Sequence, residues 1–329
     1  MFQNIQILRA VAAVMVVIFH VVLWLPRDAA SESMLFRLFS EWGKSGVDLF
    51  FVISGFVIML SQARQPRPFG AFMRNRVLRI VPLYWLVTAL FLLLAALRQI
   101  VHAEAMPQPG HAALSLAMIS WLVAAEMPVV FVGWTLEYEM LFYLLFAGAC
   151  LRVPLRHVVW VLGGVLAMAV WLGLVEQMVL EFVLGMLIAQ ARLLFCRIPA
   201  PWLLFAAGCA LFMLPAFQSV TGPRLLHLGL PAAMIVAGLA FMSQWRSRVG
   251  SYLGAASYSI YLGQALAIPI MQRVVLAILP DAPFDLQAGL ITLLAVLAGC
   301  ALYSLIERPL GVWLKGPARQ AATVGRVQR

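Results

Sequence analysis

Residues 5–25 read IQILRAVAAVMVVIFHVVLWL, an almost unbroken apolar run. A membrane-spanning helix needs about 20 predominantly apolar residues, so this stretch is long enough to cross a bilayer. The run contains two ionisable residues, Arg9 and His20, which do not suit the apolar centre of a cleaved signal peptide. We therefore expect residues 5–25 to form a retained first transmembrane helix.

The composition extends this interpretation to the whole chain. Of its 329 residues, 64% are hydrophobic and 11% are charged, whereas soluble domains are roughly 45–50% apolar and about 25% charged. The sequence predicts an all-α integral membrane fold with about ten transmembrane helices. It also predicts one transmembrane domain over residues 1–315 and a short basic cytoplasmic tail over residues 316–329. The expected spans are residues 5–25, 45–63, 80–98, 132–151, 156–174, 178–196, 201–218, 226–243, 254–278 and 288–307.

The distribution of basic residues predicts the orientation. Residues 112–127 are apolar but short for a span, so we expect them to be interfacial or re-entrant. With ten crossings and a cytoplasmic N-terminus, 17 of the 23 Lys and Arg residues lie on the cytoplasmic side, as the positive-inside rule requires. Both termini are then cytoplasmic. The net charge of +10 is mostly a consequence of this topology, so the expected partner is the lipid bilayer and not nucleic acid.

Three ionisable residues are expected at similar depth below the outer surface. At 1.5 Å of rise per residue, His20 lies roughly 8 Å, Asp48 roughly 5 Å and Glu139 roughly 10 Å inside their helices. A neutral imidazole can take a proton from a hydroxyl while a carboxylate orients it. We therefore predict His20 as a general base with Asp48 or Glu139 beside it. A hydrogen bond that serves only helix packing is the alternative.

Residues 69–80 predict an amphipathic basic helix at the inner membrane face. Arg76 and Arg79 are three residues apart and share a face of this helix. Two guanidinium groups on one face can hold phosphate oxygens bidentately. Pairing with anionic lipid headgroups is the alternative. The four cysteines lack the paired spacing of a zinc site, so we expect no metal.

Several motifs, in order along residues 5–309, resemble the acyltransferase-3 family of polytopic membrane acyltransferases, particularly its exopolysaccharide-modifying members. One departure is Gln264, at a position that many relatives fill with His; its amide can hydrogen-bond but cannot take up a proton. The motifs are Arg9 and His20 with ten residues between them, Gly-Val-Asp and Ser-Gly-Phe within residues 46–56, Arg-x-x-Arg and Pro-x-Tyr-Trp within residues 76–85, Trp134–Met140, Ser257–Leu262 and Glu307–Pro309.

This resemblance implies an O-acyltransferase in the plasma membrane, the bacterial inner membrane. The donor would be cytosolic acyl-CoA, with acetyl the expected group, and the acceptor a hydroxyl of a cell-surface or exported glycan or a lipid-linked saccharide. A proton-coupled transporter or flippase is the alternative, in which buried charges line a substrate path. The implied residues are Arg9, Arg76 and Arg79 for the donor, His20, Asp48 and Glu139 for catalysis, and Trp134, Tyr258 and Gln264 for substrate binding.

Overall fold

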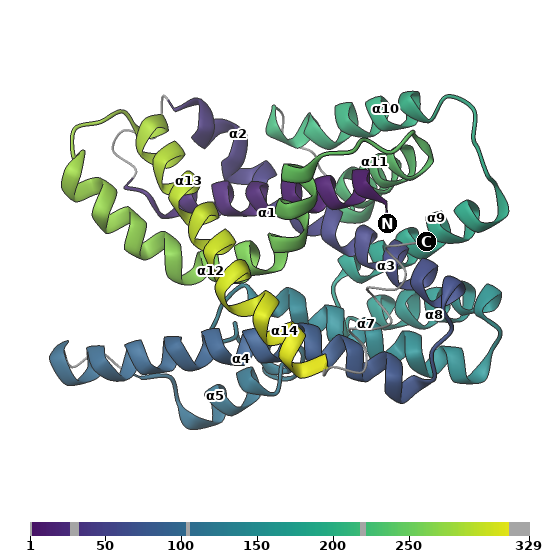
Figure 1. The fold of residues 1–329 in the computed structure, drawn as a ribbon, viewed down its shortest axis with the longest axis horizontal. Helices are drawn as coiled ribbons and strands as arrows, with labels where there is room; N and C mark the ends of the chain where they lie inside the picture. The colour runs from purple at the N-terminus through teal and green to yellow at the C-terminus, as the bar shows by residue number, and fades with distance from the viewer. Residues whose placement is uncertain (1, 27–32, 103–105, 218–221, 316–329) are drawn as a thin grey trace.

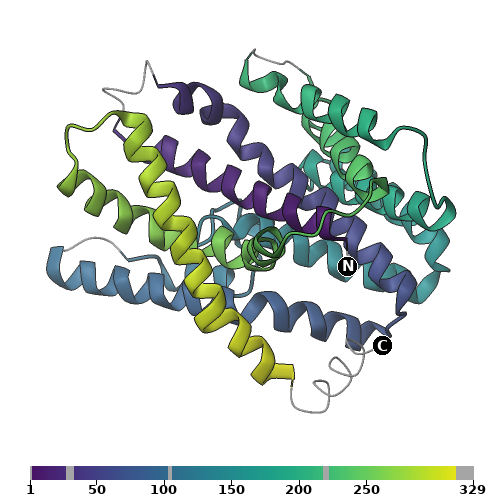
Figure 2. The ribbon, with the colours of Figure 1, turned by 45° about the horizontal axis from the view of Figure 1, so that its top comes forward.

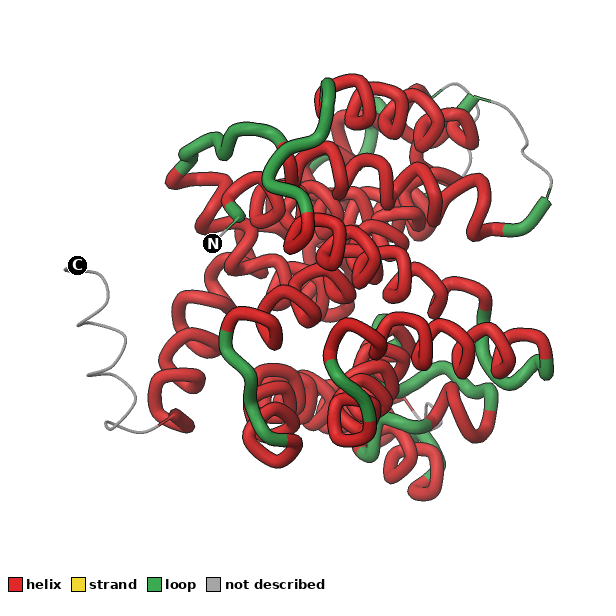
Figure 3. The backbone as a smooth tube through the Cα atoms, turned by 90° about the vertical axis from the view of Figure 1, so that its right-hand side faces the viewer, coloured by secondary structure: helices red, strands yellow, loops and turns green. Residues whose placement is uncertain are grey.

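The computed structural model describes residues 2–26, 33–102, 106–217 and 222–315, so the predicted tail of residues 316–329 lies outside the described residues. Within the described ranges, all regular secondary structure is helical (Figure 3), which confirms the all-α prediction. The α-helices are α1 (Gln3–Trp24), α2 (Met34–Trp42), α3 (Gly46–Arg64), α4 (Phe69–His102), α5 (Pro109–Leu116), α6 (Ser120–Ala124), α7 (Gly133–Arg152), α8 (Leu155–Trp171), α9 (Leu180–Leu194), α10 (Pro201–Met213), α11 (Leu230–Phe241), α12 (Arg248–Ile278), α13 (Phe284–Leu302) and α14 (Arg308–Lys315).

Short 3₁₀ or π-helical turns join several of these helices. The 3₁₀ turns are η2 (Gly43–Ser45), η3 (Gln177–Val179) and η4 (Leu214–Ala216), and the π-helical turns are η5 (Leu225–Gly229) and η6 (Tyr303–Glu307). Through η6, α13 continues into α14 and crosses over α4 (Figure 1).

About six helical stretches in the described part are long and apolar enough to cross a membrane. Three shorter apolar helices and α7, which has 20 residues and carries two glutamates, account for the other predicted spans. Each of the ten predicted segments thus overlaps a helix, while the length criterion supports about six. The six stretches are Gln3–Trp24, Gly43–Arg64, Phe69–Leu97, Gln177–Leu194, Arg248–Ile278 and Phe284–Leu314.

One predicted boundary is wrong. The basic helix of residues 69–80 and the span of residues 80–98 form a single helix, α4, of 34 residues. Pro82 lies inside it, and a proline is tolerated in such a helix when neighbouring groups satisfy the freed backbone carbonyl. As expected, residues 112–127 contain no helix long enough to span, because α5 has 8 residues and α6 has 5.

Helix α1 runs through the middle of the molecule, with α3 on one side and α12 and α13 on the other (Figures 1 and 2). The main contact of α3 is with α9, where Gly55 and Gly185 face the opposite backbone. A Cβ atom added at either glycine would lie 2.0 Å from a carbonyl oxygen of the other helix. Small residues allow membrane helices to approach this closely.

Many large apolar side chains lie on the exterior of the molecule. Large side chains such as Trp171 (78% exposed) and Trp313 (76% exposed) lie on it, and only 28% of the most apolar part of α4 is buried. A soluble monomer rarely exposes apolar patches of this extent. Together with the long apolar helices, this surface indicates a multi-pass membrane protein.

Candidate functional site: an arginine-lined pocket inside the helix bundle

A pocket of about 790 Å³, including the part that is open to solvent, lies between α1, α3, α4, α7 and α12. Its lining residues on α3 extend from Val47 to Ile58, which is roughly 16 Å along the helix axis. The pocket is therefore elongated, and residues from five helices that are far apart in sequence meet around it.

Arg9, Arg76 and Arg79 all line this pocket, so the structure brings together the three predicted donor-binding residues. Arg76 is 8% exposed, and its guanidinium lies over the rings of Phe72 (5.3 Å) and Tyr143 (5.5 Å). Its buried Nε has no hydrogen-bond partner among the described residues. No described residue forms an ion pair or hydrogen bond with any of the three guanidinium groups. Arg76 is the buried member of the three, whereas Arg9 is half-buried and Arg79 is exposed. A buried cation without a partner is costly, so this cluster is suited to an anionic ligand.

Glu139 lies in the same pocket and accepts hydrogen bonds at Oε1. Ser54 Oγ of α3 donates to it over 2.8 Å, and the Tyr143 hydroxyl, one turn further along α7, donates to the same oxygen. Sequence reasoning assigned no role to Ser54 or Tyr143, although Ser54 belongs to the Ser-Gly-Phe motif and Tyr143 follows Glu139 at i+4. Glu139 is thus placed with the arginines and not against His20.

Two neighbouring residues of α12 contribute to the pocket wall. Tyr258, a predicted substrate-binding residue, lines the pocket, and its hydroxyl donates to the Ile80 carbonyl over 2.7 Å. Ser257 is fully buried, and its Oγ has no partner in the described part of the chain. Ser257 is therefore a candidate ligand contact that the motif contained but the sequence reasoning did not single out.

His20 lies outside the pocket lining, in contact with aromatic rings and one amide. Its ring centroid is 5.0 Å from Phe19, 4.9 Å from Phe131 and 5.8 Å from Trp24. Its Nδ1 is 3.1 Å from Gln264 Oε1. The Gln264 amide also donates to the carbonyl of Tyr261, which lines the pocket. One turn of α12 thus links the pocket to His20.

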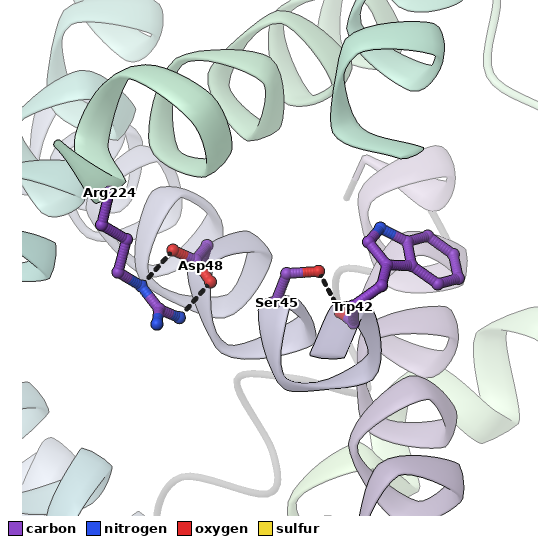
Figure 4. A network of polar contacts seen from close by, with 4 residues as sticks. All are labelled: Trp42, Ser45, Asp48 and Arg224. Atoms are coloured by element: carbon purple, nitrogen blue, oxygen red, sulfur yellow. Dashed lines mark hydrogen bonds and ion pairs between the residues drawn. The ribbon is translucent and has the colours of Figure 1, made fainter. Parts of the chain in front are cut away.

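Asp48 does not contact His20. It is fully buried, and its two oxygens accept from Arg224 Nε over 3.0 Å and from Arg224 Nη2 over 2.6 Å (Figure 4). Arg224 directly precedes the π-helical turn η5. Fully buried Glu181, from α9, adjoins this ion pair. The predicted placement of Asp48 or Glu139 beside His20 is therefore wrong, because similar depth does not place residues on the same side of their helices.

Trp134 and Glu137 of α7 both contact α6 and hold it against α7. The Trp134 ring lies 6.2 Å from Trp121 and 6.1 Å from Tyr138, outside the pocket lining. Glu137 Oε2 accepts from the backbone N–H groups of Trp121 (2.9 Å) and Leu122 (3.1 Å) at the start of α6. Glu137 and Glu139 are two residues apart on α7, which places them on different sides of the helix, and they have different partners.

Comparison with known proteins agrees with the resemblance drawn from the motifs. Residues 2–305 match the acyltransferase domain family, and the chain belongs to this family, the acyltransferase-3 proteins. It is 33% identical over 296 residues to the exopolysaccharide production protein ExoZ of Rhizobium meliloti (strain 1021), which covers 82% of this chain and 89% of that protein. No solved structure matches the chain.

Proposed function

We propose that the protein transfers an acyl group, with acetyl the expected group, from cytosolic acyl-CoA to a hydroxyl of an exopolysaccharide or its lipid-linked precursor. The observation that carries this proposal is the elongated pocket with three unpaired guanidinium groups. The name of the similar Rhizobium protein, which refers to exopolysaccharide production, supports the class of acceptor.

The pocket fits the chemistry of a CoA ester. Arg9, Arg76 and Arg79 would bind the phosphate groups, and the buried, unpartnered Arg76 Nε and Ser257 Oγ offer two further donors. From Arg9 to His20 the rise along α1 is roughly 16 Å, which is similar to the roughly 16 Å of α3 that lines the pocket. The pantetheine arm would lie along the pocket, with the thioester at the end near Tyr261.

In this proposal His20 is the general base. Its imidazole takes the proton of the acceptor hydroxyl, the hydroxyl oxygen attacks the thioester carbonyl, and the C–S bond breaks. The imidazolium then returns the proton to the departing thiolate, so the reaction needs no other proton source. Glu139 stays a catalytic candidate at the polar centre of the pocket, where it orients the Ser54 and Tyr143 hydroxyls. Asp48 would act only indirectly, through its pairing with Arg224.

The proposal includes the orientation. Ten crossings with both termini in the cytoplasm of a bacterial inner membrane would place the arginines near the cytosol and His20 near the outer surface. The donor would then enter from the cytosol, while the acceptor would approach from outside.

The test is release of free CoA thiol from acetyl-CoA by the purified protein in nanodiscs, with isolated exopolysaccharide as acceptor. Arg76→Lys retains the charge but loses the planar fork, so we expect weaker acetyl-CoA binding with unchanged folding. Arg74→Lys is the matched control, because Arg74 is an exposed arginine of the same helix outside the pocket lining. Equal binding by the parent and both variants would refute the donor site. Absence of thiol release, with saccharide movement that depends on an ion gradient, would favour the transporter.

A further inference from the structure

Gln264 is fully buried and makes two hydrogen bonds with different atoms of its amide. Its Nε2 donates to the main-chain carbonyl of Tyr261, one turn earlier on α12, over 2.8 Å. Its Oε1 lies 3.1 Å from Nδ1 of His20 on α1. Among the described residues, Gln264 is the one side chain that hydrogen-bonds the imidazole.

These two contacts favour one of the two neutral tautomers of His20, whose imidazole also has a main-chain hydrogen-bond partner, Val16, one turn earlier on α1. A carbonyl oxygen only accepts hydrogen bonds, so the Tyr261 carbonyl requires the NH₂ group of Gln264 and turns Oε1 toward His20. The amide oxygen also only accepts, so the nitrogen that faces it, Nδ1, must be the donor. A neutral imidazole has one N–H, and Nε2 is therefore left with its lone pair.

We propose that Gln264 is a positioning residue that holds His20 in the Nδ1–H tautomer and keeps Nε2 free to accept the proton of the acceptor hydroxyl. This inference rests on the proposed role of His20 as general base. In the other tautomer the Nδ1 lone pair would face the lone pairs of Gln264 Oε1 at 3.1 Å, which is repulsive in an apolar surrounding. The rings of Phe19 and Phe131 leave the imidazole little room to turn away.

A neutral amide differs from a carboxylate in this position. No carboxylate of the described residues hydrogen-bonds His20, because Asp48 pairs with Arg224 and Glu139 lies in the arginine pocket. Gln264 can therefore orient the imidazole without adding a negative charge that would favour its protonated form. The base stays neutral, which is the form that proton abstraction needs.

The kinetic test compares three variants in the acetyl-transfer assay, normalised to folded protein. Gln264→Leu removes the acceptor at similar volume, and we expect kcat to fall about tenfold or more with KM for acetyl-CoA unchanged. Gln264→Glu retains an acceptor but adds a negative charge, which favours the protonated imidazole. We therefore expect near-parental kcat at high pH, while on acidification kcat should begin to fall at a higher pH than in the parent. Gln272→Leu is the matched control, since Gln272 Nε2 on the same helix donates to the Trp24 carbonyl of α1 over 3.0 Å without touching His20. It should leave kcat unchanged.

A spectroscopic measurement reads the tautomer without activity. Long-range ¹H–¹⁵N correlation spectra of histidine-labelled protein, assigned by comparison with His20→Gln, should show the Nδ1–H tautomer in the parent and loss of that preference in Gln264→Leu. A parental spectrum with Nε2–H at His20 would overturn this inference. Parental kcat in Gln264→Leu, when His20→Gln is inactive, would also overturn it while leaving the general base intact. Active His20→Gln would instead refute the proposed function.

Discussion

Replacing Arg224 with Ala should destabilise the protein more than it slows the reaction. Asp48 is fully buried and the Arg224 side chain is 29% exposed, with contacts of 2.6 and 3.0 Å between them. Removing one partner of a buried ion pair costs about 3–5 kcal/mol, because the other charge stays buried without its partner. Since Arg224 is partly exposed, we expect the lower end, about 3 kcal/mol, which is roughly a hundredfold in the unfolding equilibrium constant. Glu181 beside Asp48 adds a second carboxyl group that loses its cation.

Further substitutions separate charge from geometry at this pair. Arg224→Lys keeps the charge but loses the two-point contact, so its loss of stability should be intermediate. In a double-mutant cycle with Asp48→Asn, the combined loss should be smaller than the sum of the single losses, because the first substitution already removes the interaction. Arg273→Ala is the control for loss of an arginine without a buried partner. Arg273 is exposed on α12, so stability should change by no more than about 0.5 kcal/mol.

The assay is the unfolding midpoint of purified protein in mixed micelles with increasing denaturing detergent, followed by acetyl transfer per folded molecule. We expect lowered midpoints for Arg224→Ala and Asp48→Asn, while the folded fraction of each transfers acetyl groups at a rate near that of the parent. If both variants unfold like the parent but lose transfer, Asp48 takes part in the chemistry and the structural interpretation of the pair is refuted.

Two more predictions concern the contact between α6 and α7 and the topology. Glu137→Ala should lower stability by about 1–3 kcal/mol, because the backbone N–H groups of Trp121 and Leu122 lose their acceptor, and equal unfolding midpoints for parent and variant would contradict this. A cysteine replacing Trp245, which is 72% exposed between α11 and α12, should be labelled by an impermeant maleimide only from the cytoplasmic side, and one replacing Leu174, 67% exposed after α8, only from outside. Labelling of both from one side would refute the proposed orientation.

The sequence predicted the arginine cluster because the information is local. Arg76 and Arg79 are three residues apart, and a helix necessarily places such residues on one face. The prediction that Arg9 lies in the same site as Arg76 and Arg79 came from the family resemblance and not from spacing. Ser54 and Tyr143 could have been found by the same reasoning, since Tyr143 is one turn from Glu139 on α7.

The partners of Asp48 and His20 could not be predicted in this way. Arg224 is 176 positions from Asp48 and Gln264 is 244 positions from His20, and no periodicity connects residues so distant. The rise per residue gives the depth of a side chain in the membrane, but its direction depends on how the helices pack. Depth alone therefore suggested that His20, Asp48 and Glu139 lie together, whereas helix packing gives each of them different neighbours.

The carboxylates described above and the pocket arginines have different physical explanations. Asp48 pairs with Arg224, Glu137 binds backbone N–H groups, and Glu307 accepts from Ser259 Oγ over 2.5 Å. Each of these carboxylates joins two helical segments and needs no ligand to explain it. The pocket arginines form no hydrogen bond or ion pair with a described residue, although Glu139 and Glu307 lie near enough to Arg9 to interact with it electrostatically. Of the three, Arg76 is buried, and burial of an unpaired cation is costly. An anion bound in the pocket would give the buried guanidinium of Arg76 the partner that it lacks. For this reason we expect acyl-CoA to raise the unfolding midpoint of the parent and to have less effect on a protein that lacks Arg76.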